Sequence, residues 1–445
     1  MKNDTFRWVK TDTASIMFSA LTTKKWGRTF RLTAGLDRPV EPLLLARAVS
    51  DVLPYYPNLR LSLRRGFFWT YQTFSGRLPE IRPEGRRPLQ PITSRYRGLP
   101  DFRLVYRDHE VSLESSHSIG DGRGVMREFE EILSRYLSLQ EGSSSPYTPF
   151  VSEKDSMENA FDTYFDKNGP SEEGKMQKAF HFEECWTPDY IRLLFAEMDE
   201  QHILDLAHAR DMTVTEYLCA VLIAGVIRAA DGPVTAPVTI AVPVDLRRFF
   251  PTKSLRNFTI QSYISFDPAG RADWSVDEIC KATFGQLRDS LTVGHMQPTL
   301  NRYGKLRTNP VLRAVPYFIK RPVLVKAQNA THAAVTTIFT NLGERTLPPA
   351  LQGRVTRLRF VNGDTRSYGL AVTASCVSCN GTLSLCFSRA NRDTSWFDAC
   401  VSILRAEGVE VHTSSIEGAA PPEAPETPRE KTPFSMEKLK AYFNF

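Results

Sequence analysis

The sequence lacks any long hydrophobic run. Its longest apolar stretch, Tyr217 to Ile227, is about half of the ~20 residues that a transmembrane helix needs. The opening MKNDTFRWVKTDTAS also has no apolar core of the kind found in secretory signals. We therefore expect no transmembrane segment. We interpret Tyr217 to Ile227 as a buried helix that begins at a capping box formed by Thr213 and Glu216.

Cysteine is scarce as well. The 445 residues contain seven cysteines, an odd and scattered set that predicts reduced thiols in a cytoplasmic protein rather than a disulfide framework. Cys376 and Cys379 form a single CxxC, but no second pair and no histidine at ligand spacing accompany them. We expect no metal site, and we interpret the alternating pattern around these cysteines as buried strand and hairpin.

Signatures of nucleic-acid binding are absent, because no zinc finger or RNA-recognition motif occurs. The net charge of +6 is only mildly basic, with cationic stretches at 59–66, 85–98 and 320–326. These residues either spread over solvated faces or attract an anionic partner, such as a phosphorylated cofactor or an acidic carrier protein. Nucleic acid is therefore not an expected partner.

The first unit of the chain, residues 1–140, mixes strands with helices. Alternating residues predict strands at 29–36 and 61–74 and a hairpin over 102–117, since side chains alternate between the faces of a strand. Apolar residues at helical spacing predict a helix that ends before Pro54 and another that begins after Gly122. We expect this unit to form one subdomain.

A linker, a second unit and a tail follow. Residues 141–178 are rich in Ser, Gly, Pro and charge, which indicates a linker or crossover. The second subdomain, 179–411, is predicted to contain several helices and strands, listed here: helices at 199–209, 214–230, 275–293, 308–320 and 394–406, and strands at 238–249, 333–340, 355–361, 368–377 and 382–388.

The tail, 412–445, contains a Pro-rich stretch that cannot fold alone and a short helix-like end. A helix this short is marginal by itself, so we expect it to dock on its own body, with a partner or a membrane surface as alternatives.

The stretch SSHSIGDGRG at 115–124 carries the most informative pattern. His117 ends a strand face that begins at Val111, and a tight turn then leads to a helix. An imidazole titrates near neutral pH and can accept a proton there, and the turn brings Asp121 near it. Gly122 would leave room beside the ring for a substrate. The alternative is an ordinary polar histidine at a strand end.

These residues resemble a known motif. HSIGDG at 117–122 is similar to the HxxxDG motif of the chloramphenicol-acetyltransferase-like superfamily, which includes condensation domains and alcohol acetyltransferases. Residues 242–259 resemble its PVxxR strand and following Asn, 336–349 its strand and Gly turn, and 29–69 its opening strand, helix and strand. The resemblance, strongest to bacterial alcohol-acetyltransferase-like proteins, runs from about residue 5 to 411. It implies an α/β (α+β) fold of two subdomains facing across a central tunnel.

The resemblance also implies a mechanism. His117 matches the general base, which deprotonates an acceptor hydroxyl or amine for direct attack on an acyl thioester, so no acyl-enzyme is expected. Asp121 matches a structural residue that pairs with an arginine, for which Arg247 is the candidate and Arg248 the alternative. Donors to the oxyanion are not fixed by the sequence. The candidate substrate-binding residues are Asn257, Thr337, Thr340 and Asn341.

Two differences from the motifs of the superfamily argue against a peptide-condensation domain and a plant-type acyltransferase. Ser116 stands where condensation domains usually have a second histidine, and NLGER stands in place of the plant DFGWG signature. With no adjacent carrier domain, acyl-CoA is the expected co-substrate, and no tightly bound cofactor is expected. A carrier-protein-dependent acyltransferase and a non-catalytic scaffold of the same fold are the alternatives. Acceptor identity, acyl length and oligomeric state cannot be read from the sequence.

Overall fold

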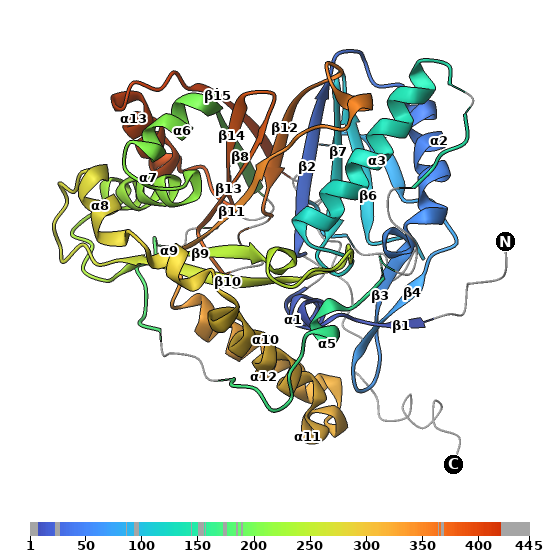
Figure 1. The fold of residues 1–445 in the computed structure, drawn as a ribbon, viewed down its shortest axis with the longest axis horizontal. Coiled ribbons are helices and arrows are strands. Elements are labelled where there is room, and N and C mark those ends of the chain that lie inside the picture. The colour runs from blue at the N-terminus through green and yellow to red at the C-terminus, as the bar shows by residue number, and fades with distance from the viewer. Residues whose placement is uncertain are drawn as a thin grey trace, which may run out of the picture.

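The structure is a computed structural model with a mixed α/β fold of two subdomains, each built on one sheet (Figure 1). It describes residues 8–419 except for 23–26, 86, 93–97, 144, 150–154, 156, 172–175, 184–185, 188–189, 364 and 366–368. The predicted terminal helix and most of the Pro-rich tail lie outside the described residues. In the described ranges, no helix is long and apolar enough to cross a membrane.

The first subdomain centres on a five-stranded sheet with two helices packed against it. Its strands, in spatial order, are β12 (Val355–Val361), β2 (Thr29–Leu36), β7 (Glu110–Ser116), β6 (Phe102–Arg107) and β5 (Glu80–Pro83). The helices are α2 (Pro42–Val52) and α3 (Gly122–Gln140), which pack against each other. A small sheet of β1 (Trp8–Lys10), β4 (Thr70–Phe74) and β3 (Leu61–Arg65) lies beside them. These elements bury one contiguous apolar core, as the predicted helical and strand periodicities require.

The second subdomain is built on a seven-stranded sheet. Its strands, in spatial order, are β10 (Thr259–Phe266), β9 (Val238–Asp245), β11 (Thr337–Glu344), β13 (Val372–Cys379), β14 (Thr382–Arg389), β8 (Tyr190–Asp199) and β15 (His412–Ala419). Its helices are α6 (Glu200–His208), α7 (Val214–Ala229), α8 (Val276–Thr283), α9 (Gln286–Ser290) and α13 (Ser395–Ala406). Helix α7 is the predicted buried helix, and the capping box of Thr213 and Glu216 is present at its start.

Two strands pair with sheets outside the units to which the predicted domain boundaries assign them. β12, from the second unit, pairs antiparallel with β2 and so completes the first sheet. β15, assigned to the tail, pairs antiparallel with β8 at the edge of the second sheet. The boundary at residue 411 therefore separates a strand from its sheet, because a short alternating segment next to a Pro-rich stretch gives little local signal of pairing.

A third group of helices lies below both sheets in Figure 1. It consists of α10 (Val293–Thr308), α11 (Pro310–Ala314) and α12 (Tyr317–His332), with α1 (Thr13–Leu21) and α5 (Ala160–Thr163) beside it. The prediction of a single helix over 308–320 is wrong. The helix is interrupted at Val315–Pro316, and a new helix begins at Tyr317. A proline restricts the residue before it to extended backbone, which ends α11 at this point.

The cysteines in the described residues have no disulfide partner and are buried. Cys376 and Cys379 lie in β13, and burial raises the pKa of Cys379 to about 11. In the same described ranges, no cluster of three or more His, Cys, Asp or Glu is placed to hold a metal ion.

Candidate active site

His117 lies at the junction between β7 and α3. Its backbone N–H donates to the carbonyl of Arg28 at 2.8 Å, which extends the pairing of β7 with β2 by one residue. The strand therefore fixes the direction of the side chain before the turn begins. The ring lies between two aromatic rings, with centroid distances of 4.7 Å to Phe18 of α1 and 4.6 Å to Phe30 of β2.

This environment keeps the imidazole neutral. Burial lowers the pKa of His117 to about 3, with the positive charge of Arg28 as the second cause; the nearby Asn257 side chain and Gly120 backbone act in the opposite direction. The residue as a whole is partly accessible, whereas its Nδ1 atom is buried and has no hydrogen-bond partner in the part of the chain that the structure describes. A neutral ring can accept a proton, so the site holds His117 in the form that a general base requires.

Asp121 joins three parts of the structure. Its Oδ1 accepts from the Gly124 N–H at 2.8 Å and so caps the N-terminus of α3. Its Oδ2 accepts from the Phe258 N–H at 2.8 Å and from Arg247 at 2.9 Å. These contacts hold Asp121 away from a role at the imidazole: it is not among the groups that shift the pKa of His117, although the sequence placed the two near each other.

Arg247 supplies the other half of the ion pair expected from the resemblance. It belongs to a short turn, Leu246–Arg248, that follows β9. The guanidinium lies 2.9 Å from both Asp121 and Asp245 and donates to two backbone carbonyls of the loop that follows the turn. Burial lowers the pKa of Arg247, but the two carboxylates outweigh it and raise the pKa above its usual value. The guanidinium thus ties this loop to α3.

The loop at 254–258 carries the contacts across the two subdomains. The side-chain amide of Asn257 donates to the His117 carbonyl at 2.9 Å and lies 3.2 Å from Ser15 Oγ. Asn257, predicted as a substrate-binding residue, is buried and directs its N–H groups to the protein. Its N–H groups hold the backbone of His117, whereas its buried Oδ1 has no partner among the described residues, so the substrate-binding role stays a prediction.

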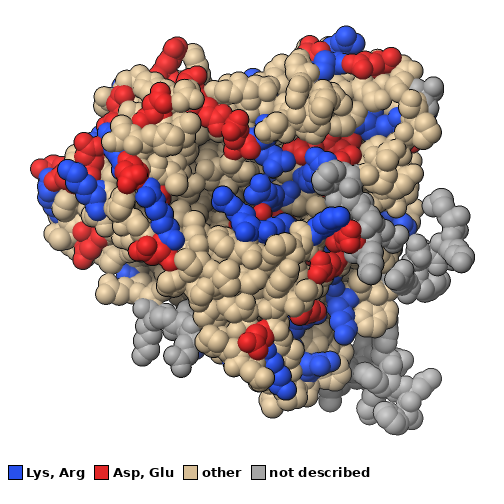
Figure 2. Space-filling view, in the orientation of Figure 1, with Lys and Arg blue, Asp and Glu red and all other residues tan. Residues whose placement is uncertain are grey.

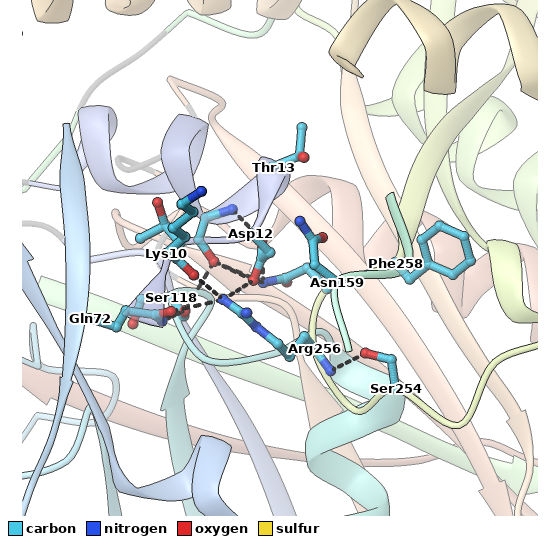
Figure 3. A network of polar contacts seen from close by, with 12 residues as sticks. Lys10, Asp12, Thr13, Gln72, Ser118, Asn159, Ser254, Arg256 and Phe258 are labelled. Atoms are coloured by element: carbon cyan, nitrogen blue, oxygen red, sulfur yellow. Dashed lines mark hydrogen bonds and ion pairs between the residues drawn. The ribbon is translucent and has the colours of Figure 1, made fainter. Parts of the chain in front are cut away.

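Arg256, one residue earlier, anchors the same loop on the other side. Its guanidinium donates to the Lys10 carbonyl at 3.0 Å and to Gln72 Oε1 at 2.9 Å, and it lies 3.6 Å from the buried Asp12 carboxylate (Figure 3). Gln72 in turn donates to the carbonyl of Ser118, next to His117. The network therefore links α1, β4 and the histidine turn.

Glycines allow this close approach. A Cβ at Gly124 would lie 2.1 Å from the Leu255 carbonyl oxygen, which is not sterically possible. Gly122 has another environment, since its Cβ would meet Leu342 and Phe360 at 3.3 Å. The expectation that Gly122 leaves space for a substrate is therefore wrong, because the side chains of Leu342 on β11 and Phe360 on β12 fill that space.

The three predicted donors on β11 differ in their surroundings. Thr337 is fully buried and its hydroxyl donates to the Val372 carbonyl at 3.1 Å, so it is not available to a substrate. Thr340 Oγ1 is buried and without a partner among the described residues. Asn341 donates to Thr215 at 3.0 Å and lines a surface cavity. Thr340 and Asn341 remain candidates.

Two adjoining cavities open beside this site. One has a volume of about 540 Å³ and the other about 390 Å³. They share Arg123 and Arg247, and neither is lined by His117. The basic residues that line them are Arg123, Arg127, Arg247, Arg248, Lys253 and Arg345. Figure 2 shows Lys and Arg gathered in the hollow between the two halves of the molecule.

A two-subdomain α/β architecture with a histidine loop between the halves is that of the chloramphenicol-acetyltransferase-like fold, and comparison with solved structures shows that this chain has it. No protein-family model matches the sequence, and no curated protein matches it. The fold that the short motifs predicted is thus confirmed by likeness of structure rather than by a match of sequence.

Three solved structures illustrate the likeness. Polyketide synthase associated protein 5 from Mycobacterium tuberculosis is 15% identical with a TM-score of 0.57, covering 89% of this chain and 97% of that chain. TRI101 of F. graminearum, complexed with coenzyme A and deoxynivalenol, is 12% identical with a TM-score of 0.58, covering 91% and 99%. The epimerization domain from the third module of tyrocidine synthetase B is 13% identical with a TM-score of 0.53, covering 90% and 95%. At these identities the likeness shows the fold alone.

Sequence reasoning missed the residues that enclose His117 from α1. Asp12 caps α1 by accepting from the Ser15 N–H at 2.7 Å, and Ser15 Oγ donates to the Ser118 carbonyl at 2.9 Å. Phe18 of the same helix covers the imidazole. The spacing of Asp12 and Ser15 before an apolar run is a helix-start signal that could have revealed α1, but not its place over the histidine.

Proposed function

We propose that the chain is an acyltransferase that moves an acyl group from a CoA thioester to an acceptor hydroxyl or amine. The observation that carries the proposal is the neutral imidazole of His117, held through its backbone by Asn257 and Arg28 and flanked by apolar rings. TRI101, a protein of the same fold that has been crystallised with coenzyme A and deoxynivalenol, supports this proposal.

In the proposed reaction His117 takes the acceptor's proton. With Nδ1 buried, Nε2 is the ring nitrogen that faces the acceptor. The acceptor oxygen or nitrogen bonds to the thioester carbonyl carbon, and its proton passes to Nε2. The tetrahedral intermediate then collapses, the C–S bond breaks, and the thiolate takes the proton from the imidazolium. Atoms and charge balance without an acyl-enzyme.

Oxyanion stabilisation is assigned to β11. A tetrahedral intermediate needs a donor that is already in place and not committed elsewhere. Thr340 meets this condition, because its buried hydroxyl has no partner among the described residues, while Thr337 does not. Asn341 would act from the cavity side. Asp121 and Arg247 act as positioning residues that fix the turn to the second subdomain.

The basic cavities would receive the phosphates of the donor. Arg123, Arg127, Arg345 and Lys253 lie near acidic side chains, whereas Arg248 forms no ion pair within the described part of the chain. A carrier protein with an acidic surface would meet the same cations, and this is the second candidate donor. Acyl-CoA and an acidic carrier protein would both present negative charge to these cations, so an activity assay with each donor must distinguish them.

The test is thiol release from acyl-CoAs of increasing chain length, with and without a pool of alcohols and amines. We expect release that requires an acceptor and falls by about 10²–10⁴ in His117→Ala. His109→Ala, in an exposed turn of the same hairpin, is the matched control and should keep its rate. Turnover only with acyl carrier protein would favour the second donor, and no turnover with either would favour a scaffold.

A further inference from the structure

An exposed apolar surface lies far from the proposed reaction. Seven of the large apolar residues that are most exposed come from two segments of the chain, the tip of the β3–β4 hairpin and the region from the last turn of α10 to α12. They are Phe67, Phe68, Leu306, Val311, Phe318, Ile319 and Val323. Phe318 is 67% exposed, and Phe67 and Val323 are each 65% exposed. We refer to these seven residues, with Arg313 and Lys326, as the aromatic-basic face.

The two segments form one surface. The N–H of Tyr317 donates to the Phe67 carbonyl at 2.7 Å, and the rings of Phe67 and Phe318 are 6.2 Å apart. Beneath them, the Lys320 ammonium lies 3.4 Å from the centroid of the Trp69 ring. The hairpin tip is therefore held against the start of α12, so its aromatic side chains project from a built platform.

Helix α12 presents one side to solvent. Phe318, Ile319, Pro322, Val323 and Lys326 are all exposed, and their spacing of one and four residues places them on a single helical face. Four of these five side chains are apolar. A helix in a water-soluble protein normally directs such a face inward, so this face is suited to an apolar environment outside the chain.

The charge around this face has one sign. The 54 residues from Ser290 to Gly343 contain seven lysines and arginines and no aspartate or glutamate. Arg313 and Lys326 are exposed and form no ion pair with any described residue. Among the described residues, acid meets this region at Asp162, which pairs with Arg307, and at Asp166, which contacts Asn301 of α10. Exposed apolar side chains flanked by unpaired cations complement a surface that is both apolar and anionic.

We propose that the aromatic-basic face docks on an anionic membrane surface. Aromatic side chains that enter the headgroup region, with basic residues beside them, are the combination that binds peripheral proteins to acidic lipid. A second copy of the chain would bring the same cations into contact. The proposal does not depend on acyl transfer.

The test is co-sedimentation of the full chain with vesicles of phosphatidylcholine alone and of phosphatidylcholine with phosphatidylglycerol. We expect binding to the anionic vesicles, weakened by salt and at least about tenfold weaker on neutral ones. The pair Arg313→Glu and Lys326→Glu should weaken it by about thirtyfold or more, and the pair Phe67→Ser and Phe318→Ser by about tenfold or more. Because these side chains are exposed, circular dichroism should show unchanged folding.

Matched controls come from other exposed sites. Leu43 on α2 is 86% exposed, so Leu43→Ser removes an exposed apolar side chain away from the face. Lys281→Glu on α8 reverses the charge of an exposed lysine. Both should bind anionic vesicles as the wild type does. Equal binding to both vesicle types, or a control that weakens binding as much as the face variants, would overturn the proposal. Self-association that Phe67→Ser and Phe318→Ser abolish, without vesicle binding, would assign the face to a second copy instead.

Discussion

The imidazole of His117 lies between two aromatic rings, and its burial, followed by the positive charge of Arg28, opposes its protonation. In the proposed reaction this has two consequences. The ring is in its basic form throughout the physiological pH range, and the imidazolium formed during attack is a strong enough acid to protonate a departing thiolate. The depressed pKa therefore favours the second proton transfer, from the imidazolium to the thiolate, while it makes the neutral ring a weaker base for the first.

The first prediction at the residue scale concerns pH. The acid limb of kcat/KM reports the free enzyme's base, so it should lie well below pH 6.5, the usual pKa of histidine. An acid limb between pH 6 and 7 that is absent from the residual activity of His117→Ala would contradict the burial of the ring.

The same pKa predicts how stability depends on pH. Because the folded pKa is lowered, the unfolded chain takes up the proton first, so stability is complete above pH 6.5 and is lost as the pH falls toward 3. One such histidine contributes at most about 1.4 kcal/mol per pH unit in this window. Urea unfolding at pH 7 and pH 5 should show a smaller loss in His117→Ala than in the wild type. An equal loss would mean that His117 is not buried neutral.

Asp121 allows its two roles to be separated by one substitution. Asparagine caps a helix about as well as aspartate, so Asp121→Asn keeps the cap on α3 but removes the charge that faces Arg247. Because Asp245 and two backbone carbonyls still face the guanidinium, weakening this one buried partner should cost about 1–3 kcal/mol of unfolding free energy and reduce activity with it. The exposed pair of Arg38 and Asp37 is the control, since Arg38→Ala should cost less than about 1 kcal/mol.

At the scale of elements, local patterns in the sequence were sufficient for much of the fold. The strands at β2, β6 and β7 and the helices α2, α3 and α7 follow from alternation, helical spacing and caps. The sequence did not reveal which strands pair with one another. β12 gives the same local signal whichever sheet it joins, and its pairing with β2 depends on a chain path across both subdomains.

The same limit applies to the site. His117 and the pair Asp121–Arg247 follow from the resemblance of short motifs. The role of Asn257 could not be predicted, because a loop asparagine looks alike whether it faces a substrate or a backbone carbonyl. Gly122 was misread for a related reason: whether a missing side chain leaves space depends on Leu342 and Phe360, which are more than 200 residues away.

The contact between α3 and the 254–258 loop gives a prediction at this scale. In Gly124→Ala the new methyl group would meet the Leu255 carbonyl at 2.1 Å, so the loop must move. Overpacking of this kind typically costs about 1–3 kcal/mol, and it should reduce activity because the loop carries Asn257. Gly232→Ala, which meets no atom within 4 Å, should leave both unchanged. Wild-type melting and turnover in Gly124→Ala would show that the loop does not position His117.

At the scale of the whole molecule, positive charge is concentrated in two separate places. One is the hollow between the subdomains, where the basic cavities adjoin the Asp121–Arg247 pair. The other is the aromatic-basic face on the helices below both sheets. The first suits an anionic donor that reaches the histidine turn, and the second suits an anionic surface.

The most direct test of the central claim, direct acyl transfer at His117, is a single-turnover experiment with a labelled acyl-CoA. Intact-protein and product mass spectrometry would follow the acyl group with and without an acceptor. The proposed mechanism predicts that the acyl group appears on the acceptor in an amount equal to the thiol released, never on the protein, and that His117→Ala abolishes both. An acyl adduct on the wild-type protein, or undiminished transfer in His117→Ala, would contradict it.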